Sequence, residues 1–117
     1  MGGRVLVFEP DLMFSSNIES LSRRSNLSVE VKVTIDELVQ ALRASTPTAL
    51  VINLDATGGD FKSLPLPLHG SCKLIGYYSH VDSELAKDAL ENGFQVVIPR
   101  RALAGKLSDM FREFGSS

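Results

Sequence analysis

Residues 49 to 59 read ALVINLDATGG, and this stretch decides the fold. An apolar run ends at the polar residue Asn53, and a short polar segment that closes with two glycines follows it. Such a run is typical of a parallel strand that is buried on both faces and carries a site at its carboxyl end. The first polar residue is an amide, however, and the first carboxylate, Asp55, comes two positions later.

The composition predicts one globular domain that spans residues 1–117. Hydrophobic residues make up 44 % of the chain and charged residues 22 %, which is close to the average for globular proteins. A net charge of −2 argues against a nucleic-acid-binding domain. The single cysteine, Cys72, excludes an internal disulfide, fits a cytoplasmic location and is read as a small buried residue. No run approaches the roughly 20 apolar residues of a membrane span.

Strand patterns and helix patterns alternate along the whole chain. Apolar or alternating runs predict strands at residues 4–8, 27–33, 49–53, 73–78 and 95–99. Helical periodicity predicts helices within residues 11–26, 34–45, 81–93 and 101–114. Thr34 and Glu37 form a capping box at the start of the second helix, Asp82 caps the next, and Gly93 ends it. For the proline-rich segment 60–71 we expect one helical turn at most, followed by an apolar loop.

This order of elements predicts a parallel sheet with helices on both faces, in which the third helix is short or degraded. Ligand sites of such sheets lie at the carboxyl ends of the strands. The residues at the carboxyl ends of the predicted strands therefore supply the candidate site residues. They are Glu9, Pro10, Asp11, Asn53, Asp55, Tyr78, Ser79, His80, Arg100 and Arg101.

These residues give the chain a resemblance to the CheY-like receiver domain of bacterial response regulators, which act in two-component signalling and phosphorelays. The resemblance is carried by VLVFEPD at 5–11, PTALVINLDATG at 47–58 and YSHVDSELAKDALENGF at 78–94. It covers nearly the whole chain. It implies a flavodoxin-like sheet of five parallel strands in the order 2-1-3-4-5.

The resemblance also implies a role for each site position. In receivers, two acidic residues after the first strand and an aspartate after the third hold Mg²⁺, and that aspartate accepts a phosphoryl group. A Thr or Ser after the fourth strand and a Lys after the fifth bind the phosphate. Here Glu9 keeps the first acid, Pro10 replaces the second and Asn53 stands at the acceptor position. Tyr78 lies at the hydroxyl position and Arg100 at the lysine position.

An amide cannot form an acyl phosphate and is a poor ligand for Mg²⁺. We therefore expect no catalytic residue, no metal and no cofactor. The chain is interpreted as a pseudo-receiver, which is not an enzyme and acts by protein–protein interaction with other signalling proteins. The alternative is an atypical receiver with a rearranged pocket, which is phosphorylated on Asp55 or binds a small anion between Ser79 and Arg100.

Structural roles compete with functional ones at several of these positions. Asp55 is read as a solvated loop carboxylate or as a cap for the backbone near the two glycines. Asp11 either joins the acidic cluster or caps the first helix. Arg100 either binds an anion or pairs with Glu9 or Asp11.

The resemblance points to one docking surface. In the family, the fourth helix, fifth strand and fifth helix bind partners or a second copy. The resemblance therefore also allows a homodimer through this face. The matching residues run from about 81 to 114, and the candidate surface residues are Lys87, Glu91, Arg101, Lys106 and Arg112. Leu64, Leu66 and Leu68 either pack into the core, which we favour, or form an exposed patch.

Overall fold

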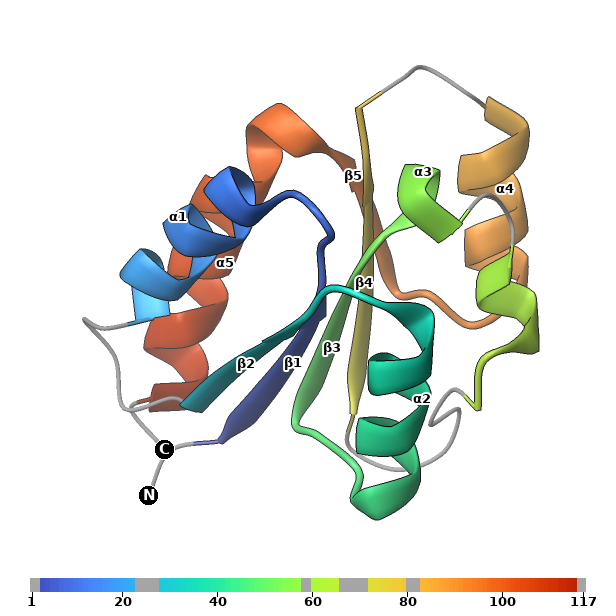
Figure 1. The fold of residues 1–117 in the computed structure, drawn as a ribbon. Helices are drawn as coiled ribbons and strands as arrows, with labels where there is room; N and C mark the ends of the chain where they lie inside the picture. The colour runs from blue at the N-terminus through green and yellow to red at the C-terminus, as the bar shows by residue number, and fades with distance from the viewer. Residues whose placement is uncertain (1–2, 23–27, 58–59, 66–71, 80–82, 116–117) are drawn as a thin grey trace.

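The computed structural model describes residues 3–22, 28–57, 60–65, 72–79 and 83–115. Its centre is one parallel sheet with the strand order β2-β1-β3-β4-β5 (Figure 1). The predicted order 2-1-3-4-5 is therefore confirmed. The strands are β1 (Arg4–Phe8), β2 (Ser28–Lys32), β3 (Ala49–Asn53), β4 (Lys73–Tyr78) and β5 (Val96–Pro99).

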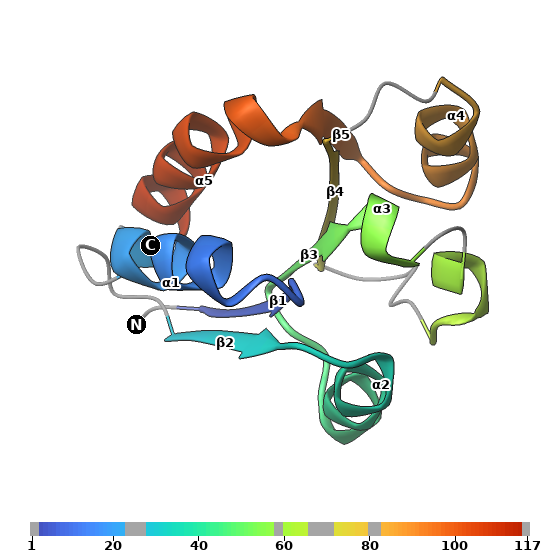
Figure 2. The same ribbon diagram turned by 45° about the horizontal axis from the view of Figure 1, so that its top comes forward.

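Helices cover both faces of this sheet, as the alternating pattern predicts. On one face, α1 (Leu12–Ser22) and α5 (Arg100–Gly115) lie side by side (Figure 2). The other face carries α2 (Ile35–Ala44), α3 (Leu54–Thr57), the 3-10 turn η1 (Asp60–Ser63) and α4 (Ser83–Glu91). The third helical region is short, as expected.

Alternate residues of the central strands supply two separate core layers. Val7 and Val51 face α1 and α5, whereas Leu6 and Leu50 face α2 and α4, and all four are fully buried. Since β1 and β3 are covered on both faces, residues 5–8 and 49–52 form uninterrupted apolar runs. Leu64 also lies in the second layer at 8 % exposure, while Leu66 and Leu68 lie outside the described residues.

Local signals account for the ends of two helices. The side chain of Thr34 accepts a hydrogen bond from the backbone N–H of Glu37, as the predicted cap requires. Gly93 ends α4 with a φ of 100°, a backbone conformation that side chains with a Cβ rarely adopt. The predicted cap Asp82 lies outside the described residues.

The segment after β3 differs from the expected loop. It forms the helical turn α3, which begins directly at Leu54. Leu54 is fully buried against β4, where a Cβ on Gly76 would approach its Cδ1 atom to 2.8 Å. The missing side chain of Gly76 thus lets this turn pack close to the sheet. None of the helices in the described part of the chain combines the length and apolar character of a membrane span.

Candidate functional site

A buried carboxylate, Glu9, lies just past the carboxyl end of β1 and is 1 % exposed. Its Oε1 atom accepts a hydrogen bond from the Tyr77 hydroxyl at 2.6 Å. The Asn53 amide nitrogen lies 3.1 Å from both carboxylate oxygens, and the backbone N–H of Asp11 donates to Oε2 at 3.0 Å. Burying a carboxylate is costly unless donors surround it, and this set provides them.

The regular alternation of the strands brings these three side chains together. Residues 5 and 7 of β1, 49 and 51 of β3, and 75 of β4 all face α1 and α5. Glu9, Asn53 and Tyr77 each lie two residues further along the chain, at the next position on this face. Asn53 is also the direct register partner of Tyr77 across the β3–β4 pair. The three residues therefore form one row across the sheet.

The orientation of the Asn53 amide follows from its second contact. Its Oδ1 atom accepts a hydrogen bond from the backbone N–H of Ala56, in the first turn of α3, at 3.1 Å. The NH₂ group therefore points toward Glu9, where it acts as a donor. Asn53 thus links the buried carboxylate to the helical turn that follows β3.

Tyr77 connects Glu9 to the helix layer. Burial, and then the hydrogen bond and charge of Glu9, raise the pKa of the Tyr77 hydroxyl above its ordinary value. The Phe14 ring packs on Tyr77 with 5.7 Å between ring centroids. The Arg100 guanidinium in turn lies 3.9 Å above the centre of the Phe14 ring. A continuous set of contacts therefore runs from the buried carboxylate to the start of α5.

Asp11 caps α1, which is one of its two expected roles. Its Oδ1 atom accepts hydrogen bonds from the backbone N–H groups of Met13 at 2.9 Å and Phe14 at 3.3 Å. Its Oδ2 atom pairs with Arg100 at 3.4 Å, which is one of the pairings considered for that arginine. The bond from the Phe14 N–H, with smaller contributions from the Met13 N–H and Arg100, lowers the pKa of Asp11.

Asp55 lies in the helical turn α3, so its expected place in a loop is wrong. The turn begins as soon as β3 ends and directs the Asp55 carboxylate toward β4. There its Oδ2 atom accepts a hydrogen bond from the backbone N–H of Ser79. Asp55 thus caps the end of the neighbouring strand, while Gly58 and Gly59 lie outside the described residues.

Four of the remaining predicted site residues border a hollow of about 380 Å³ at the same end of the sheet, namely Tyr78, Ser79, Arg100 and Arg101. Ser79 and Arg101 are exposed, and Tyr78 and Arg100 are half-buried. The lining residues are Phe14, Tyr78, Ser79, Pro99, Arg100 and Arg101. Pro10 is exposed in the connection between β1 and α1 and does not border the hollow, and His80 lies outside the described residues.

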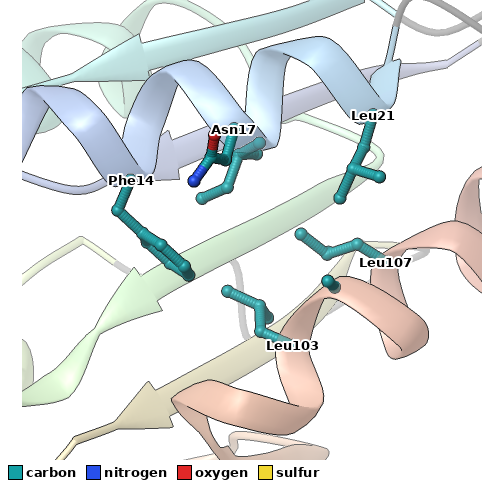
Figure 3. Close-up of a pocket in the computed structure, with 7 residues that line it drawn as sticks. Phe14, Asn17, Leu21, Leu103 and Leu107 are labelled. Carbon is teal, nitrogen blue, oxygen red and sulfur yellow. The ribbon is translucent and has the colours of Figure 1, made fainter.

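The candidate surface residues of the sequence analysis lie on α4 and α5. Lys87 and Glu91 are exposed on α4. On α5, Arg101 and Arg112 are exposed, Lys106 is half-buried, and Arg112 pairs with Asp109 one turn away. A second, apolar crevice of about 20 Å³ lies between α1 and α5. Figure 3 shows Phe14 and Leu21 of α1 facing Leu103 and Leu107 of α5 across it.

The sequence analysis missed Tyr77. The resemblance directed attention to Tyr78, because that residue aligns with the hydroxyl position of receivers. The signal that could have found Tyr77 is the alternation of β4, which places residues 75 and 77 on the same face as Asn53 and Glu9.

No protein-family model and no curated protein sequence matches the chain, but solved structures do. A response regulator from Thermotoga maritima superposes with a TM-score of 0.76 at 13 % identity, covering 100 % of both chains. The receiver domain of a response regulator from Bermanella marisrubri gives 0.77 at 20 % identity, covering 95 % of this chain and 96 % of that one. The fold is that of a response-regulator receiver domain.

A longer protein contains the same fold as one part. NtrX from Brucella abortus, solved in complex with ADP, gives a TM-score of 0.79 at 14 % identity. The match covers 99 % of this chain but only 26 % of the NtrX chain. The chain therefore corresponds to about a quarter of that protein.

The resemblance of the sequence to receiver domains implies a divalent cation at the Glu9 position, but the residues present do not fit one. Both Glu9 oxygens face N–H and O–H donors, which a cation would have to displace. Asn53 presents its NH₂ group rather than its oxygen, and Asp11 and Asp55 are turned toward backbone N–H groups. Within the described residues, no group of three or more His, Cys, Asp or Glu side chains could hold a metal.

Proposed function

We propose that this chain is a receiver-fold signalling module that takes up no phosphoryl group and acts by binding other proteins. The observation that carries the proposal is the contact of Glu9 with Asn53 and Tyr77. In this arrangement, hydrogen bonds within the chain occupy the place where a phosphorylatable receiver needs a metal and a nucleophile.

The chemistry of the side chains supports this proposal. Phosphoryl transfer to a receiver requires a carboxylate oxygen as nucleophile and a cation that neutralises the developing charge. The Asn53 oxygen belongs to a carboxamide and accepts the N–H of Ala56, so it is neither anionic nor directed into the site. Asp55 keeps a carboxylate, but its hydrogen bond to Ser79 directs it toward the backbone of β4.

Incubation with acetyl phosphate and Mg²⁺, followed by intact-mass spectrometry, tests the proposal. We expect no phosphoryl adduct on the wild-type chain or on the variant Asp55→Ala. A stable adduct on the wild type that disappears in Asp55→Ala would overturn the proposal and favour the atypical receiver.

One observation favours a second candidate function, the binding of a small anion. The hollow is bordered by two arginines and by Ser79, which are suitable donors for phosphate oxygens. Inorganic phosphate at 100 times its Kd would stabilise the fold by about 2.7 kcal/mol. A melting temperature that does not change across a phosphate titration at constant ionic strength would reject this candidate.

A further inference from the structure

The hollow beside α5 has a positively charged lining. Two of its six lining residues are arginines, two are aromatic, and none is acidic. The Asp11 carboxylate pairs with Arg100 and the Asp55 carboxylate accepts the Ser79 N–H, so the uncompensated positive charge at the hollow is that of Arg101. An occupant with a negative charge would therefore complement this hollow better than a neutral or a basic one.

One wall of the hollow is held in place from inside the protein. Arg100 lies 3.9 Å above the Phe14 ring and pairs with Asp11 at 3.4 Å, so much of its charge is already compensated. Phe14 packs on Tyr77, whose hydroxyl donates to the buried Glu9. These contacts hold the Phe14 and Arg100 side of the hollow in place without a partner, which reduces the entropy that this side loses on binding.

Arg101 is the group left for a partner. It is exposed, and none of the ion pairs between described residues includes it. The backbone N–H of Ser79 on the opposite wall is already bonded to Asp55. The Arg101 guanidinium is therefore the strongest hydrogen-bond donor at the hollow that no described carboxylate satisfies.

The helix turn that supplies Phe14 also exposes two apolar side chains. Leu12 is 69 % exposed and Met13 is 82 % exposed, and both belong to the first turn of α1. These two apolar side chains lie in the same helix turn as Phe14, which lines the hollow. A small anion would use only the arginine, whereas a peptide segment with acidic and apolar side chains would use both features.

We propose that the hollow and the Leu12–Met13 turn bind an acidic, partly apolar segment of a partner protein. In this complex an Asp or Glu carboxylate pairs with Arg101, and a neighbouring apolar side chain packs against Tyr78, Pro99 and the turn. The proposal rests on the proposed function, because it names the kind of partner that the module would bind.

Selection from a random dodecapeptide phage library on the 117-residue chain tests this inference. We expect the recovered peptides to be enriched in Asp or Glu next to an apolar residue. One such peptide, made synthetically, should shift the backbone NMR signals of Ser79, Arg100 and Arg101. The variant Arg101→Glu should weaken its binding about fivefold or more, since the charge pair is lost and a repulsion replaces it.

Matched variants separate the pairing from general charge effects. Arg43→Glu makes the same change of net charge at an exposed arginine in the last turn of α2, on the opposite face of the sheet. This variant should leave the affinity for the peptide unchanged. Met13→Ser should weaken binding without changing its salt dependence. Lysine in place of the peptide's acidic residue should restore binding to Arg101→Glu, which a merely structural role for Arg101 would not produce.

Several results would overturn the inference. These are selection of no peptide or of basic peptides, NMR shifts confined to residues away from both the hollow and the Leu12–Met13 turn, or a loss of affinity in Arg43→Glu equal to that in Arg101→Glu. Equal shifts from inorganic phosphate would replace the peptide by a small anion, and concentration-dependent shifts without peptide would replace it by a second copy. Phosphorylation by acetyl phosphate would instead refute the proposed function and leave the Arg101 pairing intact, so the two failures are distinguishable.

Discussion

At the scale of single residues, Tyr77 supplies the hydroxyl donor of the buried Glu9 carboxylate. Its hydroxyl makes the shortest of the contacts to Glu9, at 2.6 Å, inside the protein. Tyr77→Phe removes this donor but keeps the ring that packs on Phe14. We expect the free energy of unfolding in urea to fall by about 1.5 to 3 kcal/mol, as for hydrogen bonds to charged groups. Tyr78→Phe is the matched control and should change it by about 0.5 kcal/mol or less.

Tyr77 also gives a prediction at alkaline pH. The folded protein raises the pKa of Tyr77 above its ordinary value of 10.0, because burial and Glu9 disfavour the phenolate. The folded chain therefore holds this proton more tightly than the unfolded chain does. Its contribution to stability is complete below pH 10 and decreases as the pH rises further. Between pH 9 and 11, the free energy of unfolding should fall more steeply with pH in the wild type than in Tyr77→Phe. Equal slopes in the two proteins would contradict this prediction.

Asn53→Asp tests the donor role of the amide. The new carboxylate would lie against Glu9 in a buried site, so we expect the free energy of unfolding to fall by about 3 to 5 kcal/mol at pH 7. Because protonation of the new carboxylate removes the repulsion, the loss of stability should shrink as the pH falls toward 5. Mg²⁺ should raise the melting temperature of this variant but not that of the wild type.

The exposed amide Asn17 supplies the control for that experiment. Asn17→Asp adds the same charge on the surface of α1 and should change stability by about 0.5 kcal/mol or less. Rapid phosphorylation of Asn53→Asp would contradict the geometry described here, because Pro10 and Tyr78 still stand where receivers carry the second acid and the small hydroxyl residue.

At the scale of elements, one substitution should have opposite effects in α5 and in β4. Gly105 is exposed inside α5, and no atom lies within 4 Å of an added Cβ. Gly105→Ala should therefore stabilise the fold by about 1 kcal/mol, the difference in helix propensity. Gly76→Ala should destabilise it, because the new Cβ would lie 2.8 Å from Leu54. Thermal unfolding of both variants checks this, and a stabilised Gly76→Ala would contradict the close packing of α3.

The elements that the sequence predicted are those with a period. Residues 5–8 of β1 and 49–52 of β3 form uninterrupted apolar runs, and α2 repeats Ile35, Leu38 and Leu42 on one face, so sterics and burial leave few alternatives. The turn α3 has four residues and no period, and its formation depends on the Asn53 oxygen and on the space beside Gly76. These are tertiary contacts, which a local pattern does not contain.

For the candidate site, the sequence predicts which residues gather there but not how their side chains pair. Glu9, Asn53 and Arg100 follow from the rule that sites gather at the carboxyl ends of parallel strands. The pairing of Arg100 with Asp11 rather than Glu9, and the turning of Asp55 toward Ser79, depend on side-chain directions. Such directions are fixed by the α1 cap and by α3, and the sequence alone did not determine them.

At the scale of the whole molecule, the site and the core share the same strands. Tyr77 belongs to the core layer under α1 and α5, whereas Cys72, just before the same strand, belongs to the opposite layer. Both layers are built on β1, β3 and β4. A substitution that destabilises one layer should therefore also make unfolding of the other layer more frequent. A small single domain of this kind usually unfolds as one unit.

Cys72 provides the measurement of this coupling. It is 5 % exposed, and burial raises the pKa of its thiol to about 11, so the folded protein should react slowly with a disulfide reagent at pH 8. If reaction requires global unfolding, a loss of about 2 kcal/mol in Tyr77→Phe should accelerate it roughly thirtyfold. Tyr78→Phe should leave the rate unchanged, and Gly105→Ala should slow it about fivefold. A rate that is the same in all three variants would show that Cys72 opens locally, and that the two core layers are not coupled as the shared strands imply.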